Sequence, residues 1–573
     1  MLPKPLLKVE NLSVEFFTDQ GIVRAVDHVS FDLMAGQTLG LVGESGSGKS
    51  VTALAIMGLL SKSSAKITSG HIWFDHPDLG PTDLLSLSEQ ALQKIRGRYL
   101  GMIFQEPMTS LNPVKRCGEQ TQEMLLWYKL ATSADARKRA LKLFEEVRLP
   151  DPERVLKAYP HQLSGGQRQR VMIAMAMACN PSLLIADEPT TALDVTVQKS
   201  ILELMGQLQQ SHGMSIIFIT HDLGVVASIA SKAVVMLKGE VVEQGPVECI
   251  FRNPIHPYTA ALISCRPGTA TRPLRLPVVD DFLNAGQYFP GVATEPVANR
   301  QGRHQKIYSK EPLLEVTQLS TAFVTRRSLL GKPLKHHQAV DQISFSVYEG
   351  ETLGLVGESG CGKTTLGRSI MRLVEPTAGK VFYKGKDLSA LTQAELQKFR
   401  RRMQIIFQDP YSSLTPGLAI GKAIMEPMQV HGLYGNHQQR KAKTIEILEK
   451  VGLEEKHFNR YPHEFSGGQR QRVAIARALA LEPEFIICDE AVSALDVSVQ
   501  AQVLNLLNEL KENFGLTYIF ISHDLSVVKY MADRIMVMKN GKMVEMDEAD
   551  ALIQNPKQHY TKVLIEAVPQ PFF

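Results

Sequence analysis

Short apolar runs that lead into glycine-rich or acidic turns are the strongest pattern along the chain. Residues 38–42 and 352–356 are such runs, and each enters a glycine-rich stretch that is followed by a segment with helical periodicity. A strand, a loop and a helix in this order form the repeating unit of an α/β domain. The pattern therefore predicts a mostly parallel sheet as the core of each half of the chain.

The two halves repeat each other at the level of whole domains. GESGSGKS at residues 43–50 recurs as GESGCGKT at 357–364, an offset of 314, and LSGGQRQR at 163–170 recurs as FSGGQRQR at 465–472, an offset of 302. The second offset holds as far as Tyr258 and Tyr560. The difference between the offsets predicts an insertion in the first repeat near residues 67–87. A period of half the chain indicates domain duplication rather than a solenoid.

We predict that residues 266–310 form a linker between the two repeats. Prolines interrupt any period there, and no apolar face develops; they are Pro267, Pro273, Pro277, Pro290 and Pro296. We therefore expect a first domain at 1–265 that includes a C-terminal extension, and a second domain at 311–573 with a shortened extension. Helical periodicity ahead of each SGGQ run, carried by Leu141, Phe144 and Val147 in the first repeat, predicts a helical insert in each domain.

Composition excludes several classes of protein. The chain has 573 residues, 44% of them apolar, and a formal net charge of +4, which gives little non-specific attraction to nucleic acid or anionic lipid. The longest apolar runs have strand length, far short of the roughly 18 residues that a membrane span requires. The N-terminus shows no secretory signal pattern. Six cysteines without a CxxC pair argue against a zinc ribbon and a disulfide framework, and favour a reducing cytoplasm.

The pattern G-x-x-x-x-G-K-[ST] occurs twice and predicts two phosphate-binding loops. Its glycines let successive N–H groups point at phosphate oxygens at a helix N-terminus, its lysine adds positive charge, and its hydroxyl can bind Mg²⁺. One copy could be a glycine-rich turn before a buried helix, but two copies in the same context make that alternative negligible. The predicted residues are Gly43, Glu44, Ser45, Gly46, Ser47, Gly48, Lys49, Ser50 and Val51, and Gly357, Glu358, Ser359, Gly360, Cys361, Gly362, Lys363, Thr364 and Thr365.

Two apolar runs end in adjacent carboxylates, Asp187-Glu188 and Asp489-Glu490. A buried strand that ends in this way places the first carboxylate near the loop hydroxyl to hold Mg²⁺, and the second where it can polarise an attacking water. For either stretch alone, a strand that ends in a solvated acidic turn would be the favoured interpretation. Its pairing with a phosphate-binding loop favours the catalytic interpretation.

The phosphate-binding loops and acidic pairs would fit any P-loop ATPase, and the run Ser-Gly-Gly-Gln narrows this class. It occurs at Ser164, Gly165, Gly166 and Gln167, and at Ser466, Gly467, Gly468 and Gln469, each time at the start of a helical segment. A serine hydroxyl and glycine N–H groups at a helix N-terminus can hold an anion. An ordinary turn and helix cap would have the same composition, but both copies lie 24 residues before the predicted catalytic glutamate.

With these motifs, nearly the whole chain resembles the ATPases of the ABC transporter family. The resemblance implies an α/β fold of two tandem P-loop NTPase domains, each with a RecA-like mostly parallel core, an antiparallel β subdomain and a helical subdomain. It implies ATP hydrolysis with Mg²⁺. The Ser-Gly-Gly-Gln run, the signature of the family, closes over the ATP bound by the other domain, so that Ser466 would face Lys49 and Ser164 would face Lys363. Both sites are expected to be competent, although Ala491 replaces the proline found at Pro189.

The same resemblance implies further site residues. The Q-loop glutamines, which also approach Mg²⁺, correspond to Gln105 and Gln408; the switch histidines to His221 and His523; the D-loop aspartates to Asp194 and Asp496; and the aromatics that stack on adenine to Phe16 and Phe323. A phenylalanine at the end of a first strand is more often part of the core, so the stacking role and the core role remain open. A lone histidine is likewise usually a satisfied structural residue.

A narrower resemblance lies after the first ATPase core, where residues 253–259 read NPIHPYT. This stretch is typical of the dipeptide, oligopeptide, nickel and glutathione importers, and the tandem fusion is most similar to the glutathione and related peptide importers. The resemblance implies two transmembrane permease subunits and an extracytoplasmic solute-binding protein as partners. The chain would then lie peripherally on the cytoplasmic face of a bacterial inner membrane and contact the membrane only through the permeases. Only Cys265 lies near the position of the iron–sulfur ligands of some relatives, so we expect no cluster.

Three other classes of ABC protein fit less well. A translation factor would act with nucleic acid and carry a long charged helical linker and a basic surface, whereas this linker is interrupted by prolines and the net charge is small. A DNA-repair ATPase would need zinc-binding CxxC pairs, which this sequence does not contain. An exporter ATPase is normally fused to membrane spans, and the apolar runs here are too short for that. We therefore expect an importer ATPase without a nucleic-acid partner.

Overall fold

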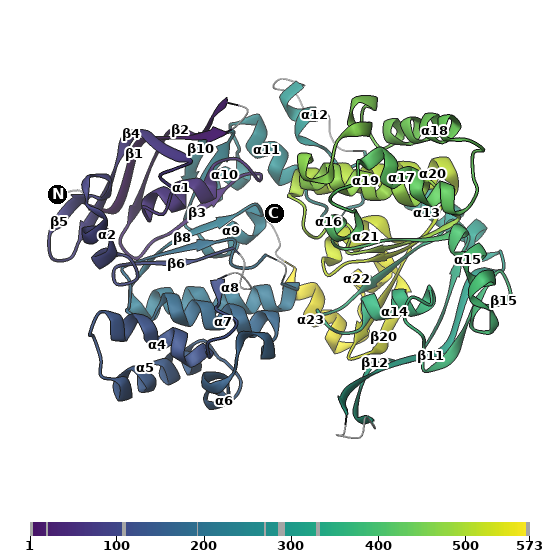
Figure 1. Cartoon of the computed structure of the whole chain (residues 1–573), viewed down its shortest axis with the longest axis horizontal. Helices are drawn as coiled ribbons and strands as arrows, with labels where there is room; N and C mark the ends of the chain where they lie inside the picture. The colour runs from purple at the N-terminus through teal and green to yellow at the C-terminus, as the bar shows by residue number, and fades with distance from the viewer. Residues whose placement is uncertain are drawn as a thin grey trace.

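Each half of the chain contains a six-stranded sheet with the same strand order (Figure 1). This computed structural model describes residues 4–18, 21–105, 110–191, 193–268, 271–284, 293–327 and 333–568. The order is β10-β9-β3-β8-β7-β6 in the first half and β20-β19-β13-β18-β17-β16 in the second. In each sheet only the edge strand β10 or β20 pairs antiparallel to its neighbour among the described residues. The predicted α/β fold with a mostly parallel core in each half is confirmed.

The strands of these two sheets are short, and the central ones are completely buried. All residues of β3, β7, β8, β13, β17 and β18 are buried. The strands are β3 Thr38–Val42, β6 Leu100–Ile103, β7 Leu183–Asp187, β8 Ser215–Thr220, β9 Lys232–Leu237 and β10 Glu240–Pro246, and β13 Thr352–Val356, β16 Met403–Ile406, β17 Phe485–Asp489, β18 Thr517–Ile521, β19 Arg534–Lys539 and β20 Lys542–Glu548.

A second, four-stranded antiparallel sheet completes each half, in the order β2-β1-β4-β5 and β12-β11-β14-β15. The predicted insertion of the first repeat lies here, because β4 has 12 residues and its counterpart β14 has 6. The strands are β1 Pro5–Thr18, β2 Gly21–Met34, β4 Ala65–His76 and β5 Gly80–Asp83, and β11 Pro312–Arg327, β12 Pro333–Tyr348, β14 Ala378–Tyr383 and β15 Lys386–Asp387.

Helices cover the parallel sheets and form the predicted helical inserts. The helices of the first half are α1 Lys49–Ile56, α2 Glu89–Ile95, α4 Cys117–Trp127, α5 Ser133–Glu146, α6 Pro152–Lys157, α7 Gly165–Ala176, α8 Val195–His212, α9 Leu223–Ile229, α10 Val247–Arg252 and α11 Pro257–Ser264. Those of the second half are α14 Lys363–Ile370, α15 Gln393–Arg402, α16 Pro410–Ser413, α17 Ile420–Val430, α18 His437–Lys450, α19 Gly467–Leu479, α20 Val497–Phe514, α21 Leu525–Met531, α22 Ala549–Gln554 and α23 His559–Ala567.

The segment between the repeats is packed against both halves, which corrects the expectation that it has no apolar face. It contains α12 Val279–Asn284 and α13 Val297–Tyr308, while Pro290 lies outside the described residues. Its buried side chains, Leu276, Val278, Val279 and Phe282, belong to the same core as α20. The apolar positions were missed because the apolar stretch is too short, with a helix of only six residues, to show a helical period between the prolines.

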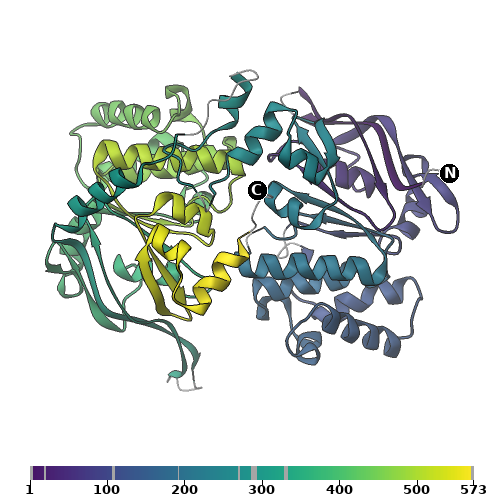
Figure 2. The same cartoon turned by 180° about the vertical axis from the view of Figure 1, so that it is seen from behind.

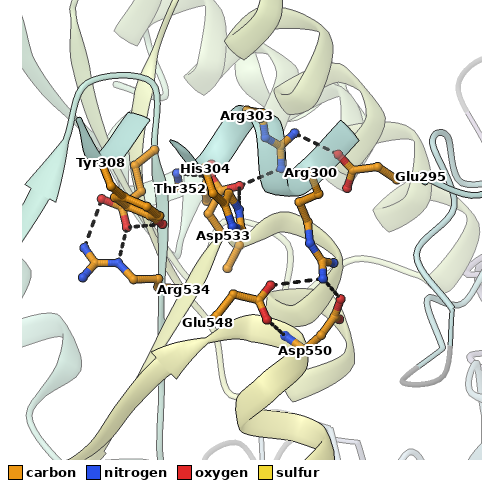
Figure 3. Close-up of polar contacts among 12 residues, drawn as sticks. Glu295, Arg300, Arg303, His304, Tyr308, Thr352, Asp533, Arg534, Glu548 and Asp550 are labelled. Atoms are coloured by element: carbon orange, nitrogen blue, oxygen red, sulfur yellow. Dashed lines mark hydrogen bonds and ion pairs between the residues drawn. The ribbon is translucent and has the colours of Figure 1, made fainter. Parts of the chain in front are cut away.

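Polar contacts then fasten α13 to the second half (Figure 3). Arg303 and His304 bind the buried carboxylate of Asp533, at 2.7 and 3.1 Å. Arg300 pairs with Glu548 at 3.2 Å and also with Asp550. Because each of these acidic residues belongs to the second half, α13 is an integral part of that half's structure.

The two halves lie side by side, with helices of each extension against the opposite half (Figures 1 and 2). Helix α11, from the extension of the first half, contacts α20 of the second. Helix α23, from the extension of the second half, contacts α8 of the first, where Lys199 Nζ donates to the main-chain oxygen of Glu566 at 3.1 Å. The arrangement is therefore reciprocal.

Candidate functional site

The two phosphate-binding loops join β3 to α1 and β13 to α14. Gly48 and Gly362 adopt φ of 99° and 107°, and a Cβ at either position would overlap a main-chain carbonyl oxygen of the neighbouring antiparallel sheet, so only glycine fits. Lys49 Nζ donates to the oxygens of Gly43 and Glu44, both at 2.7 Å. Burial lowers the pKa of this lysine, while Glu188 and Asp496 oppose the shift. The loop thus encloses a cation at the N-terminus of a helix, the arrangement that binds phosphate.

Each loop hydroxyl meets the first carboxylate of the acidic pair. Ser50 Oγ donates to Asp187 Oδ1 at 3.0 Å, and Thr364 Oγ1 donates to Asp489 Oδ1 at 2.8 Å. The other oxygen of Asp489 is buried without a hydrogen-bond partner among the described residues. Burial raises the pKa of both aspartates. A hydroxyl, a carboxylate and a spare buried oxygen are hard ligands, which fit Mg²⁺.

The second carboxylate of the first site, Glu188, lies at the centre of a polar cluster. Gln105 Nε2 donates to Glu188 Oε2 at 3.0 Å, Thr191 Oγ1 donates to the same oxygen at 2.9 Å, and His221 Nδ1 lies 3.3 Å from Oε1. Burial would raise the pKa of Glu188, but its contacts with His221 and Thr191 and the charge of Lys49 lower it to about 2. The carboxylate is therefore held in its ionised form.

The second site repeats this cluster with two differences. Gln408 Nε2 donates to Glu490 Oε2 at 2.8 Å, and His523 Nδ1 lies 3.5 Å from that oxygen. Ser493, the counterpart of Thr191, donates instead to the main-chain oxygen of Glu490. Ala491 replaces a proline, yet Glu490 adopts φ of 49° and Glu188 φ of 46°. The left-handed backbone at the glutamate is therefore independent of that proline.

The predicted D-loop aspartates each contact the phosphate-binding loop of the opposite half. Asp194 Oδ2 accepts a hydrogen bond from the main-chain N–H of Ser359 at 3.1 Å, and Asp496 Oδ2 accepts one from that of Ser45 at 3.0 Å. Two residues further along, Thr196 Oγ1 lies 3.3 Å from Glu358 Oε1, and Ser498 Oγ contacts Glu44 Oε1 in the same way. Each phosphate-binding loop is thus contacted by the opposite half.

The signature runs form helix N-termini, as predicted. Ser164 caps α7 by accepting from the main-chain N–H of Gln167 at 3.4 Å, and Ser466 caps α19 by accepting from that of Gln469 at 3.3 Å. These contacts lie within each serine's own half. Gly165, Gly166, Gly467 and Gly468 form the first turns of the same helices.

A cavity of about 260 Å³ adjoins the second phosphate-binding loop and contains most of the predicted residues of that site. Asp194 of the first half, Phe323, Lys363, Glu490 and His523 all line it. Phe323 is 42% exposed, which suits an aromatic that stacks on a base. Its counterpart Phe16 is partly buried and packs against the core of the first half.

A smaller cavity of about 100 Å³ lies between the halves and is lined by both His221 and His523. The two predicted switch histidines therefore line the same cavity. Together with the crossed D-loops, this cavity brings residues of both predicted sites to the boundary between the halves.

Sequence reasoning missed two tyrosines that contact the phosphate-binding loops. The hydroxyl of Tyr258 accepts a hydrogen bond from the main-chain N–H of Glu44 at 3.0 Å, and that of Tyr560 accepts one from the N–H of Glu358 at 3.2 Å. The signal was present, because both tyrosines belong to the repeated extension motif. In the sequence, however, the motif indicates a class of importer and not a contact with the loop.

Two family models match the chain. The model for ABC transporters matches residues 26–191 and 340–493, and the model for the C-terminal region of oligopeptide/dipeptide transporters matches residues 242–277 and 544–572. Both match twice, once in each half.

Curated relatives match almost the whole chain. The glutathione import ATP-binding protein GsiA of Escherichia coli O157:H7 is 48% identical over 98% of this chain and 89% of the relative, and GsiA of Shigella flexneri is 47% identical with the same coverage. A solved structure titled as a post-hydrolysis dimer of the ATP-binding cassette MJ0796 with ADP and Pi is 29% identical over 41% of this chain and 98% of that chain, with a TM-score of 0.37. The family models and the curated relatives confirm the predicted family: the chain belongs to the ABC transporter family, as an ATP-hydrolysing protein with two ATP-binding domains.

Proposed function

We propose that the chain powers the import of peptides or peptide-like solutes, glutathione among them, through two separate permease subunits. An extracytoplasmic binding protein would deliver the solute, and the chain would lie on the cytoplasmic face of a bacterial inner membrane. The observation that carries the proposal is the likeness to GsiA over 98% of the chain, extensions included. Among the described residues, no helix has both the length and the apolarity needed to cross a bilayer.

Each ATP would be bound by the phosphate-binding loop of one half. The main-chain N–H groups of residues 46–50 and 360–364 would donate to phosphate oxygens, with Lys49 or Lys363 turning from loop carbonyls to the phosphates. The exposed ring of Phe323 supports stacking on adenine at the second site. The partly buried Phe16 has a smaller free face for that role.

Hydrolysis would use the glutamate of each acidic pair as general base toward water. Glu188 and Glu490 are partly buried yet ionised, because a histidine and a lysine near each lower its pKa. Gln105 and Gln408 already contact these glutamates and would orient the water with them. His221 and His523 would contact the γ-phosphate. Positioned groups of this kind commonly contribute 10²–10⁴-fold in rate.

Mg²⁺ would be held by Ser50 and Asp187, and by Thr364 and Asp489, with Gln105 and Gln408 nearby. When bound, it would neutralise charge on the transferred phosphoryl group. The proposal includes no iron–sulfur cluster.

Binding of two ATP molecules would draw the halves together, and hydrolysis would release them, so that the permeases alternate between outward and inward access. Support comes from the crossed contacts of Asp194 and Asp496, which join each loop to the opposite half. Ser466 would then face the ATP held by Lys49, and Ser164 the ATP held by Lys363.

A transport assay tests the proposal directly. The chain would be co-purified with the permeases encoded beside its gene, reconstituted in proteoliposomes, and supplied with the binding protein and labelled glutathione or a dipeptide. We expect ATP-dependent accumulation of one of these solutes, and none with a Glu188→Gln/Glu490→Gln chain. Accumulation of neither, with intact ATP hydrolysis, would reject the peptide class while leaving the ATPase function in place.

A further inference from the structure

The extension tyrosines connect three parts of the molecule at each site. Tyr258 lies in α11, its hydroxyl contacts the N–H of Glu44, and α11 itself packs against α20 of the other half. The N-terminus of α20 returns to the same loop, since Asp496 binds the N–H of Ser45 and Ser498 contacts the Glu44 carboxylate. The first two residues of the loop after Gly43 are therefore held from two sides, by their own extension and by the opposite half.

The second site has the same closed set of contacts. Tyr560 lies in α23, which packs against α8, and its hydroxyl contacts the N–H of Glu358. Asp194 and Thr196, at the start of α8, contact Ser359 and Glu358. The presence of the same arrangement in both halves argues against an accidental contact.

The two halves share only part of the extension motif, namely an acidic residue that holds the turn and the tyrosine that follows it. The turn before Tyr258 is held by Glu243, whose carboxylate accepts from the N–H groups of Ile255 and His256 at 3.0 and 3.1 Å. In the second half, Glu545 accepts from the N–H groups of Lys557 and Gln558 at 2.8 and 3.1 Å, although the His-Pro pair is replaced there. The side chains of the turn differ, yet the acidic anchor and the tyrosine contact with the loop are the same.

Burial makes the tyrosine hydroxyl a rigid partner. Tyr258 is fully buried and Tyr560 is 9% exposed. Burial raises the pKa of Tyr258, and the carboxylates of Glu44 and of Asp496 in the other half add to the shift. The hydroxyl therefore stays protonated and lies close to charged groups of both halves.

We propose that Tyr258 and Tyr560 are positioning residues that fix the start of each phosphate-binding loop, so that it engages the D-loop helix of the opposite half. Each extension is then a third component of an ATP site, beside the loop and the opposing D-loop. The tyrosines touch no phosphate-binding N–H group, because Glu44 and Glu358 precede the part of the loop that faces phosphate. They act on the alignment of the two halves, and so on turnover rather than on ATP affinity. The inference rests on ATP hydrolysis by the chain and not on the solute that is imported.

The test is steady-state ATP hydrolysis by the full chain with Tyr258→Phe, Tyr560→Phe and the parent. Loss of one hydrogen bond predicts a decrease in kcat of about fivefold for each variant, with a change in the KM for ATP of less than about twofold. The matched control is Tyr518→Phe, since Tyr518 is equally buried and donates to the main-chain oxygen of Leu507 at 3.1 Å, away from both loops. Its kcat should equal that of the parent, whatever its thermal stability.

A double variant tests the connection between the halves. Because Tyr258 and Ser498 hold the same glutamate, Tyr258→Phe combined with Ser498→Ala should lower kcat by less than the product of the two single effects. An unchanged kcat in Tyr258→Phe, a raised KM with unchanged kcat, or a fully multiplicative double variant would each overturn the inference. Absence of ATP hydrolysis in every chain, the parent included, would instead count against the ATPase function.

Discussion

Asp194 of the first half accepts a hydrogen bond from the main-chain N–H of Ser359 in the phosphate-binding loop of the second half, at 3.1 Å. The same carboxylate caps its own helix α8, because Oδ1 accepts from the N–H of Val197 at 2.9 Å. Asp496 makes the reciprocal contact with Ser45, but makes no side-chain cap bond on α20. Both aspartates thus contact the loop of the opposite half, but only Asp194 also caps its own helix.

That difference predicts distinct effects of Asp194→Ala and Asp496→Ala. Both variants should lose several-fold in ATP hydrolysis, because each breaks a contact between the halves. Only Asp194→Ala should also lower the free energy of unfolding by about 1 kcal/mol, the usual contribution of a helix cap. Urea unfolding and ATPase rates measure the two effects separately.

Thr132→Ala is the matched control for Asp194→Ala. Thr132 caps α5 by accepting from the N–H of Asp135 and belongs to the helical insert. We expect a similar loss of stability and an unchanged ATPase rate. Equal destabilisation by Asp194→Ala and Asp496→Ala would contradict the assignment of the cap to Asp194.

Glu188→Gln and Glu490→Gln test whether both sites hydrolyse ATP. Each single variant should lose most of the activity, by about 100-fold if the sites are coupled, and the double variant should retain none. Glu203→Gln, on the exposed face of α8, removes the same charge and should leave the rate unchanged. If Glu490→Gln behaved like the parent, the second site would be inactive, and Ala491 would be the first difference to revert to proline.

Thr191→Val tests the inequivalence of the two glutamate clusters. The threonine hydroxyl donates to the Glu188 carboxylate at 2.9 Å, whereas Ser493 donates only to the main chain of Glu490. Valine keeps the shape of the side chain and removes this bond, so kcat should fall about fivefold. Ser493→Ala should lower kcat by less than twofold, and a larger effect of Ser493→Ala than of Thr191→Val would refute this interpretation.

The fold and the local geometry around the candidate site could be predicted because their signals are local. The strand before each phosphate-binding loop and the helix after it are continuous in sequence, and the signature serines lie at helix N-termini as their composition predicts. The contacts between Asp194 and Ser359, and between Tyr258 and Glu44, join residues 165 and 214 positions apart. No periodicity or spacing encodes such pairs, and only the packing of the halves brings them together.

In the linker, amino-acid composition did not predict which residues are buried. Its prolines lie outside the two described helices of the segment, α12 and α13, but they do not exclude burial. Leu276 is packed into the core of the second half, where its main-chain N–H and oxygen both bond the side chain of Asn505, at 2.9 and 2.8 Å. A proline-rich stretch can bury isolated apolar residues when side chains of another element satisfy its backbone.

Asp533→Asn should show that the linker stabilises the second half. The Asp533 carboxylate is buried, and it faces Arg303 and His304 from α13, Lys511 from α20 and the N–H of Thr352. Burial alone would raise its pKa, but the charge of Lys511 and the contacts with His304 and Arg303 hold it well below the usual value. Removal of one member of a buried ion-pair network predicts a loss of about 3 kcal/mol in the free energy of unfolding at pH 7.

The pH dependence separates this charge effect from a packing defect. A carboxylate whose pKa is lowered by folding contributes stability that is complete above its unfolded pKa of about 3.9, and that is lost as the pH falls below it. The difference in unfolding free energy between parent and Asp533→Asn should therefore be constant from pH 7 to about pH 5 and shrink toward pH 3. The control is Asp280→Asn, on the exposed face of α12, which should show no difference at any pH. A difference that stayed constant down to pH 3 would mean that the ionised carboxylate is not what ties α13 to the second half.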